Sequence, residues 1–584
     1  MKEAQKGTTG TGVQEPEEAD VHVPGTEILL DLDGHSHLQH AKSGHGQVLL
    51  VPQPSLTDPN DPLRWPRWKK WMVFFNALTY TFLGSNIGPL MSGGMVQQSA
   101  YFGIPIGHLS WAAGISLLCS GVSTIFWVVG ELMWRHFVVP GLTWSQPLFV
   151  KYGRRPVYLA STLITGAMCI WCGVAAKTTF GSFFAARAFV GWFIGPIESI
   201  SASTITDIFF LHDRGEKISI WGLSILGGNE IGPVLSAYII QAIGMSWAFY
   251  IIGIAIFANS LTIFFTMPET AYWGPRPKIS LRLLHEGNGA VVVGDSDRDH
   301  GPSENVSVEK NTTQVEPHTG GAVKVGLMHE QPSKRPYIRE MHPFPVVNST
   351  LSLGKLFLRP FVLLTYPTVL WASLIYGMAL AWNVILALTI AQLFAPPPYL
   401  FNSGAQGLIF IAPATGSLIA TYLCGPLADQ LATFYTRRNG GIREPEMRLP
   451  VAFMAAFFTF TGVAIAGPCY AHETHWIGPI FGFGVLSIGA QMAANLATTY
   501  CLDSHKELSG EVMTTISATK CVLAWTWSWF INDWIILNGM MTVYFIAAAI
   551  NIVVLSSTFL LYFKGKQIRI RIQQRNLLGR LNLI

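Results

Sequence analysis

The sequence predicts an all-helical membrane protein with twelve transmembrane helices arranged in two halves of six. Half of the 584 residues are apolar, 12% are charged, and the mean hydropathy is +0.37. Soluble domains carry roughly 25% charged residues, so this composition excludes an ordinary soluble protein. A polar segment at 268–361 separates two groups of six apolar runs. Such a division indicates two related halves.

Each apolar run has about the 20 residues that a helix needs to cross a bilayer. We place the spans at 71–92, 108–129, 155–177, 182–205, 217–243, 247–267, 362–389, 405–428, 450–471, 476–500, 511–533 and 540–563. The polar composition of the remaining parts predicts a disordered N-terminal tail. The predicted domains are the tail (1–68), a first bundle (69–267), a linker (268–361), a second bundle (362–565) and a C-terminal tail (566–584).

Lysine and arginine residues gather in the loops on one side of the predicted membrane, whereas the short loops on the other side hold essentially Lys177. The basic residues are Lys69, Lys70, Lys151, Arg154, Arg155, Arg214, Lys217, Arg276, Lys278, Arg437, Arg438, Arg443, Arg448, Lys506, Lys564, Lys566, Arg569 and Arg571. Loops rich in such residues stay in the cytoplasm. We therefore expect both tails and the linker to be cytoplasmic. Because apolar runs begin only near Trp71, we expect no cleavable signal peptide.

The segment 129–146 interrupts an otherwise regular pattern between the second and third spans. Removing it joins Val128 directly to Pro147 and produces one clean span followed by a short basic loop. We interpret the segment as a retained intron, because its ends can be encoded by splice signals. The alternative is a genuine reentrant or interfacial insertion.

The stretch 226–234 stands out within the fifth predicted span. It holds Gly227, Gly228, Gly232, Pro233 and Glu230 within about two turns. A carboxylate at mid-membrane is costly and proline removes a helical hydrogen bond. Glycines allow close helix packing. The stretch therefore predicts either a helix that lines a polar cavity with Glu230 or a kinked packing helix whose carboxylate pairs internally.

Two basic loops occupy equivalent places in the two halves. The first contains Lys151, Gly153, Arg154 and Arg155, and the second contains Gly425, Asp429, Glu446 and Arg448. Together they resemble the signature of the major facilitator superfamily between helices two and three and its repeat between helices eight and nine. Val150 stands where that family has Asp. The resemblance therefore implies a charged gating lock mainly in the second half, formed by Asp429, Glu446 and Arg448.

Further motifs support this resemblance over about residues 47–565. Arg187 and Gly191 are similar to a fourth-helix motif, and Gly228, Gly232 and Pro233 resemble the antiporter motif of helix five. Pro268-Glu269-Thr270 resembles the end of helix six in fungal members. The chain is thus similar to fungal twelve-helix drug:proton antiporters, and within them to the group named for histidinol and polyamine transport.

The resemblance implies the major facilitator fold, two six-helix bundles around a central cavity. It implies a plasma-membrane antiporter, acting as a monomer in the lipid bilayer, that exchanges protons for a small organic compound. Proton coupling would involve Arg187, Glu198 and Glu230, although Arg187 has the alternative of a structural arginine with a satisfied partner. The other function kept open is import of cationic amines or other nutrients, coupled to protons.

Other polar residues within predicted spans are candidates for the cavity, namely Asn383, Asn495 and Lys520. Lys520 could pair with Glu230 or Glu198, or extend towards the membrane surface. No span has metal-ligand histidine spacing, and the sequence has no phosphate-binding loop and no nucleophile elbow. We therefore expect no enzyme activity, no metal, no cofactor and no nucleic-acid partner.

The predicted topology can be tested through Asn305, Asn311 and Asn348, which begin glycosylation sequons in the linker. Because we place the linker in the cytoplasm, we expect none of the three to carry a glycan. Glycosidase treatment followed by mass mapping measures this directly. A glycosidase-sensitive mass shift at any of these asparagines would reverse the topology.

Overall fold

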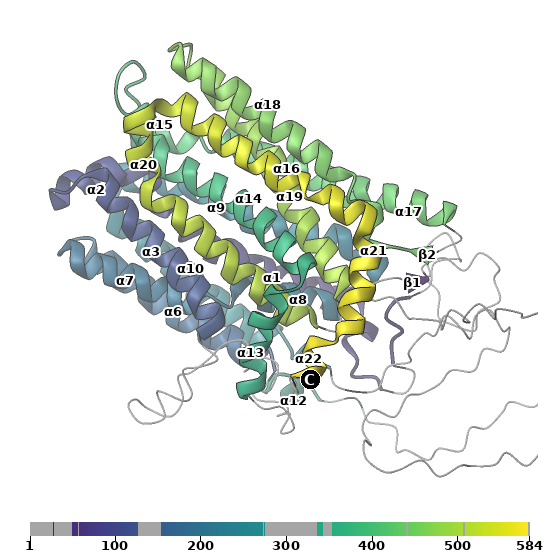
Figure 1. Ribbon diagram of the computed structural model, residues 1–584. Coiled ribbons are helices and arrows are strands. Elements are labelled where there is room, and N and C mark those ends of the chain that lie inside the picture. The colour runs from purple at the N-terminus through teal and green to yellow at the C-terminus, as the bar shows by residue number, and fades with distance from the viewer. Residues whose placement is uncertain are drawn as a thin grey trace, which may run out of the picture.

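The computed structural model describes residues 27–28, 50–126, 153–274, 334–342, 353–439, 442–505 and 508–581, with short gaps at 56–57, 273 and 335. Within these ranges the chain is a bundle of long helices (Figure 1). The segment 129–146, Lys151, the three sequons and most of the predicted N-terminal tail and linker lie outside the described residues.

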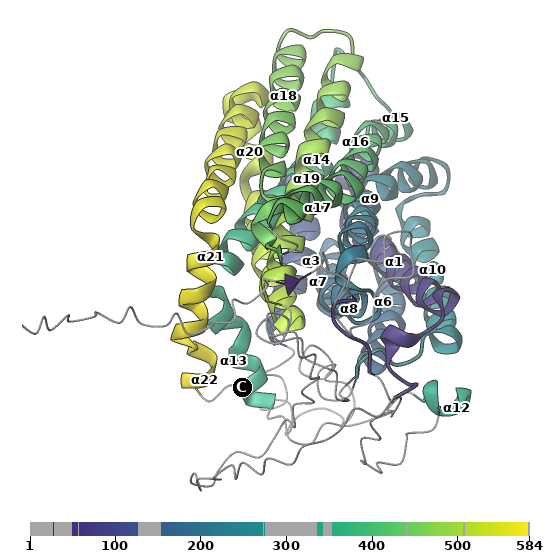
Figure 2. The ribbon, with the colours of Figure 1, turned by 90° about the vertical axis from the view of Figure 1, so that its right-hand side faces the viewer.

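Two groups of helices lie beside each other, the first half in purple to blue and the second in green to yellow (Figure 2). The first half consists of α1 (Arg67–Asn86), η2 (Pro89–Gly94), α2 (Met95–Phe102), α3 (Ile106–Phe126), α6 (Arg155–Ala175), α7 (Phe180–Ile194), α8 (Ile197–Ile208), α9 (Leu211–Ile243) and α10 (Met245–Thr266). Two short elements flank these helices in the sequence. The 3₁₀ turn η1 (Pro62–Arg64) precedes α1, and α12 (Tyr337–Glu340) lies between α10 and the second half.

The second half begins with α13 (Leu353–Leu364) and follows the same pattern of long helices. It contains α14 (Pro367–Phe394), α15 (Ser403–Leu408), α16 (Ile411–Tyr422), the π-helical turn η3 (Leu423–Leu427), α17 (Ala428–Arg438), η4 (Pro445–Arg448), α18 (Val451–Ala471), α19 (Ile477–Ser504), α20 (Ser509–Ser556), α21 (Thr558–Arg575) and α22 (Leu577–Arg580). Two short strands, β1 (Glu27–Ile28) and β2 (Ile442–Arg443), pair antiparallel.

Ten stretches of the described residues are long and apolar enough to cross a membrane. The last of these, Ser509–Arg580, includes α20, which reverses direction at Gly539. Gly539 has φ +76°, a conformation that glycine adopts without strain. α1 is a 20-residue helix that lies outside the ten stretches. The all-helical membrane fold is confirmed, while the total of twelve spans stays a prediction.

Prolines account for two differences from the predicted spans. The fourth predicted span is divided into α7 and α8 at Gly195 and Pro196, because proline cannot donate the backbone hydrogen bond that continues a helix. The seventh was expected to begin at 362, but α14 begins at Pro367 and the separate helix α13 precedes it. Proline is favourable in the first turn of a helix, where its missing donor costs nothing.

The end of the predicted disordered tail is ordered, which corrects the expectation for residues 50–66. The buried carboxylate of Asp61 accepts hydrogen bonds from the backbone N–H groups of Ser55 and Leu63. The N–H of Leu211, at the start of α9, donates to the carbonyl of Val51 at 2.8 Å. Composition predicted disorder here because these polar groups look solvated, whereas they satisfy one another and the first turn of α9.

The two halves meet along two main lines. α3 of the first half packs against α20 of the second, and α9 packs against α15, α16 and α19. At the α3–α20 line, the rings of Trp111 and Trp529 stack with centroids 4.8 Å apart. The functional side chains described below lie along these contacts.

Candidate functional site

Two adjoining cavities lie between the halves. They contain about 480 and about 550 Å³ of space between protein atoms, part of it continuous with the outside, and they share Gly88, Leu117, Asn229 and Leu380. The first is mainly apolar, with Asn383 of α14 among its polar residues. The second extends along α7 and α8 to Glu198. The cavity predicted at the centre of the fold is therefore present, with Asn383 and Glu198 on its walls.

An ion pair joins the two halves at the wall of the second cavity. Glu198 lies in the first turn of α8, and its Oε2 pairs with Nζ of Lys520 on α20. The same oxygen accepts a hydrogen bond of 3.0 Å from the Ser517 hydroxyl. Nζ of Lys520 also lies 3.8 Å from the ring centroid of Tyr376 on α14. Of the alternatives for Lys520, the structure selects pairing with Glu198.

This ion pair is deeply buried, because the Lys520 side chain is 0% exposed and that of Glu198 is 12% exposed. Removal of one partner from such a pair leaves an uncompensated charge and typically costs 3–5 kcal/mol. The pair is therefore a strong link between α8 and α20. The strength of this contact depends on the charge of Glu198, whose carboxylate lies next to the second cavity.

Glu230 lies at a different contact between the halves. Its side chain is buried, and Oε1 accepts hydrogen bonds from the hydroxyls of Ser417 on α16 (2.8 Å) and Ser487 on α19 (2.6 Å). Its Oε2 has no hydrogen-bond partner among the described residues. Glu230 is absent from the described walls of both cavities, where its neighbour Asn229 stands.

Gly228 and Gly232 hold α9 close to α1. A Cβ atom at Gly232 would lie 2.1 Å from Oδ1 of Asn86, and one at Gly228 would lie 2.7 Å from the carbonyl oxygen of Phe82. Larger side chains would therefore push the helices apart. α9 continues through Pro233 to Ile243. The three residues act in helix packing, whereas a role for them in antiport stays a prediction.

Arg187 is fully buried in α7 and is satisfied mainly by backbone carbonyls. Its guanidinium donates to the carbonyl oxygens of Ile87 (2.7 Å), Gly88 (2.9 Å) and Ala112 (3.3 Å) and to the Ser116 hydroxyl (3.2 Å). These contacts tie together the end of α1, the start of η2 and α3. The geometry fits the structural alternative for Arg187, and its role in proton coupling stays a prediction.

Asn495 of α19 faces α9 and is not among the described residues that line the two cavities. A Cβ atom at Gly222 of α9 would lie 1.9 Å from its Oδ1, so glycine is required for this close approach. Nδ2 of Asn495 has no hydrogen-bond partner among the described residues. Asn383 thus lines the first cavity, whereas Asn495 lies at the contact between α19 and α9.

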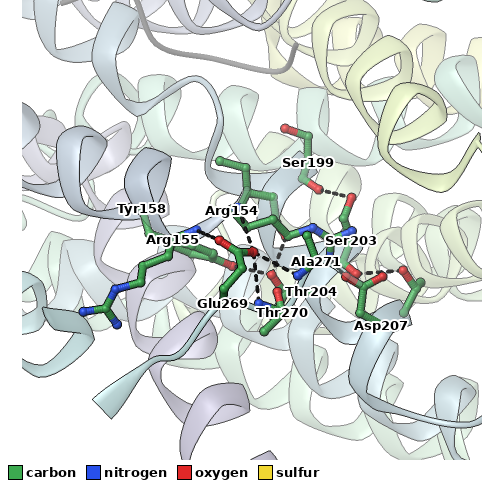
Figure 3. A network of polar contacts seen from close by, with 12 residues as sticks. Arg154, Arg155, Tyr158, Ser199, Ser203, Thr204, Asp207, Glu269, Thr270 and Ala271 are labelled. Atoms are coloured by element: carbon green, nitrogen blue, oxygen red, sulfur yellow. Dashed lines mark hydrogen bonds and ion pairs between the residues drawn. The ribbon is translucent and has the colours of Figure 1, made fainter. Parts of the chain in front are cut away.

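The first basic loop is organised by Glu269, which follows α10 (Figure 3). Its carboxylate accepts hydrogen bonds from the backbone N–H groups of Arg154 (2.9 Å) and Arg155 (3.1 Å). The side chain of Arg154 pairs with Asp207 of α8, and that of Arg155 donates to carbonyls at the end of α10. Gly153 has φ +97°, and a Cβ there would lie 2.3 Å from Glu269 Oε2.

The sequence did not reveal the acidic partners of the first basic loop, because Val150 stands where the family has Asp. Asp207 and Glu269 supply the carboxylates instead, from the ends of α8 and α10. The available signal was the position of both acidic residues on the same predicted side as Arg154 and Arg155. Their contacts span up to 115 residues of sequence, which local spacing does not reveal.

The second basic loop contains the charged residues Asp429, Glu446 and Arg448. Arg448 of η4 pairs with Asp429 of α17 and with Asp503 of α19, the latter at 3.0 Å. Arg443 also reaches Asp429, at 3.4 Å, and burial lowers the pKa of Arg443 to about 10, so it stays charged at neutral pH. Glu446 instead pairs with Arg569 of α21 at 2.7 Å. The predicted lock thus consists of two adjoining clusters.

The Asp429 cluster also touches the first half. A Cβ at Gly215, near the start of α9, would lie 2.4 Å from Asp429 Oδ2 and 2.5 Å from Arg448 Nη2. One at Gly425 would lie 3.2 Å from the Ser219 Cβ. A carboxylate near the first turn of a helix is stabilised by the helix dipole. The cluster therefore lies at the contact between the two halves, near the start of α9.

Replacement of Glu269 with Gln tests the first loop. The amide has one oxygen to accept from two backbone N–H groups and carries no charge, so we expect a loss of about 1–3 kcal/mol in unfolding free energy. The measurement is chemical or thermal unfolding of the purified full-length protein in detergent.

Glu444→Gln is the matched control for this prediction, because Glu444 pairs with the exposed Lys566 at 2.8 Å. Such surface pairs contribute about 0–1 kcal/mol. Equal stability of the two variants would show that Glu269 does not organise the loop.

The comparisons with known proteins agree with this geometry. The model of the Major Facilitator Superfamily matches residues 71–528. An uncharacterised MFS-type transporter of Schizosaccharomyces pombe is 26% identical over 573 residues, covering 95% of this chain and 94% of that protein. The protein HOL1 of Saccharomyces cerevisiae is 24% identical over 602 residues, covering 94% and 95%. The MFS-type transporter penM of Penicillium rubens is 26% identical over 477 residues, covering 81% of each chain.

A solved structure of the MFS proton:xylose symporter XylE from E. coli superposes on the chain with a TM-score of 0.55. The alignment covers 85% of this chain and 97% of XylE, with 12% sequence identity. At this identity the likeness concerns the fold alone.

Proposed function

The chain belongs to the Major Facilitator Superfamily and is a secondary transporter, and we propose that it is a proton-coupled antiporter that exports a small organic compound. The observation that carries the proposal is the position of Glu198. It borders a cavity between the halves and pairs with Lys520 in the opposite half. One carboxylate is thereby linked both to the space for a substrate and to the contact between the halves.

Protonation of Glu198 explains how a proton would be exchanged for substrate. The neutral carboxyl no longer balances the ammonium of Lys520, so the contact between α8 and α20 weakens. Rocking of the two halves about a central site is the general mechanism of transporters built from repeats. Once Glu198 and Lys520 are separated, substrate and proton would compete for binding at Glu198.

Glu230 supplies a second carboxylate, at another contact between the halves. Its Oε1 is shared by two serines of the second half. Its Oε2 is buried without a described partner and can take a proton without breaking these bonds. We assign Glu230 a supporting role in coupling, with protonation changing the contact between α9 and the helices α16 and α19.

The second candidate function is import of a cationic amine, and one observation favours it. Of the described residues that line the two cavities, Glu198 carries a charge and the others are neutral. Lys520 lies behind it and is fully buried. A ligand in the cavity therefore meets a carboxylate, which would bind an ammonium group in place of Lys520.

Metabolite profiling with and without Glu198 tests the proposal. We expect overexpression of the wild-type chain to enrich one or more organic compounds in the medium, and a protonophore to abolish the enrichment. Glu198→Gln removes the coupling carboxylate, so enrichment should fall by about tenfold or more, which equals about 1.4 kcal/mol. The measurement is untargeted mass spectrometry of cells and medium.

The matched control is Asp533→Asn, which neutralises an exposed carboxylate on α20 and should leave the enrichment unchanged. Depletion of compounds from the medium would support the import function. Full, protonophore-sensitive transport by Glu198→Gln would refute the assigned role of Glu198.

A further inference from the structure

α19 carries a polar residue at every fourth position, each turned about 40° around the helix from the one before. The residues are Ser487, Gln491, Asn495, Thr499 and Asp503, and all five are buried. We call them the polar row. Residues four apart lie on nearly the same side of a helix, so the row winds slowly along α19. From Ser487 to Asp503 the helix rises roughly 24 Å, which exceeds half the thickness of a bilayer core.

The row begins at Glu230 and follows α9. Ser487 donates to Glu230, and Asn495 lies against Gly222, eight residues earlier on α9. The two helices therefore run antiparallel along this contact. Gln491 is midway between Ser487 and Asn495 on α19, and its side chain is fully buried. The row lies between the halves, separate from the Glu198 cavity.

The row ends in the cytoplasmic ionic cluster. Asp503 pairs with Arg448 at 3.0 Å, and Arg448 pairs with Asp429, which touches the start of α9 at Gly215. One continuous series of polar side chains thus leads from the middle of the interface to its cytoplasmic edge.

Several atoms of the row are buried without a hydrogen-bond partner among the described residues. They are both amide atoms of Gln491, Nδ2 of Asn495, Oδ1 of Asp503 and, at the start, Oε2 of Glu230. A buried polar group without a partner is costly, and native proteins satisfy such groups with ordered water. Neighbouring side chains of the row can supply the two to four partners that each buried water needs.

We propose that the polar row binds a chain of water molecules that conducts protons between Glu230 and the cytoplasmic cluster at Asp503. A proton leaves Oε2 of Glu230 for the adjacent water, passes along the hydrated row and reaches the carboxylate of Asp503 or cytoplasmic water. No other bond changes. The proposal rests on the proposed function, because it gives Glu230, the carboxylate with the supporting role in coupling, its route to the cytoplasm.

Infrared difference spectroscopy of the full-length protein in lipid nanodiscs tests the path without knowledge of the substrate. The probe is a step in pH, and the signal is the carboxyl band that Glu230→Gln removes. Gln491→Met and Asn495→Leu replace polar members of the row with apolar residues of similar size. Each should slow the response of the band by about tenfold or more, which equals about 1.4 kcal/mol in the barrier. Gln491→Asn keeps an amide and should respond at nearly the wild-type rate.

The matched control is Thr498→Val, which removes a buried hydroxyl from α19 outside the row, where it donates to the carbonyl of Ala494. It should leave the rate unchanged. Wild-type rates in both Gln491→Met and Asn495→Leu would overturn the path while leaving the role of Glu230 intact. A wild-type protein without any Glu230 band that responds to pH would overturn both the path and the coupling role of Glu230. Because the two row variants are independent, misfolding of one still leaves the other as a test.

Discussion

The ion pair between Glu198 and Lys520 is the interaction on which the central part of the structure depends. It joins α8 of the first half to α20 of the second, with the aromatic ring of Tyr376 against the ammonium. A charge pair removed from water contributes net stability only when geometry and hydrogen bonds are good. Burial of such a pair beside a cavity costs free energy that packing alone does not require. The proposed mechanism gives it a purpose, because there the pair opens and closes.

In the proposed transport cycle the two halves separate and rejoin, and the other polar contacts between them suit such a motion. Glu230 is held by two serines, and the Asp429 cluster reaches the start of α9. Close approaches at Gly222 and Gly215 bring α9 next to these groups. An interface built from hydrogen bonds and ion pairs at small residues can separate and rejoin with limited repacking, whereas interlocked large apolar side chains cannot.

The sequence allowed much of the fold to be predicted, because apolar runs and basic loops reflect the bilayer directly. The same uniform apolar composition gives little information about the position of the site. A helix that is apolar on all sides does not reveal its inward face, so Asn383 and Asn495 looked equivalent and only Asn383 lines a cavity. Contacts such as Arg154 with Asp207 or Glu198 with Lys520 join distant segments, and single-sequence spacing carries no record of them.

Some of the missing information was nevertheless present as a pattern. The fourfold spacing from Ser487 to Asp503 is visible in the letters, yet its meaning depends on the partner helix that the fold supplies. The ordered segment at 50–66 is a similar case. Its polar residues are visible in the sequence, but the buried carboxylate of Asp61 as a common hydrogen-bond acceptor is a property of the folded chain.

The central claim is that the Glu198–Lys520 pair holds the two halves together. A double-mutant cycle tests it most directly, using unfolding of the full-length protein in detergent for Glu198→Gln, Lys520→Met and the double variant. We predict that each single variant loses about 3–5 kcal/mol and that the double variant loses far less than their sum, because it leaves no unpaired buried charge. Losses that add to within about 0.5 kcal/mol would contradict the account, since independent sites behave in that way.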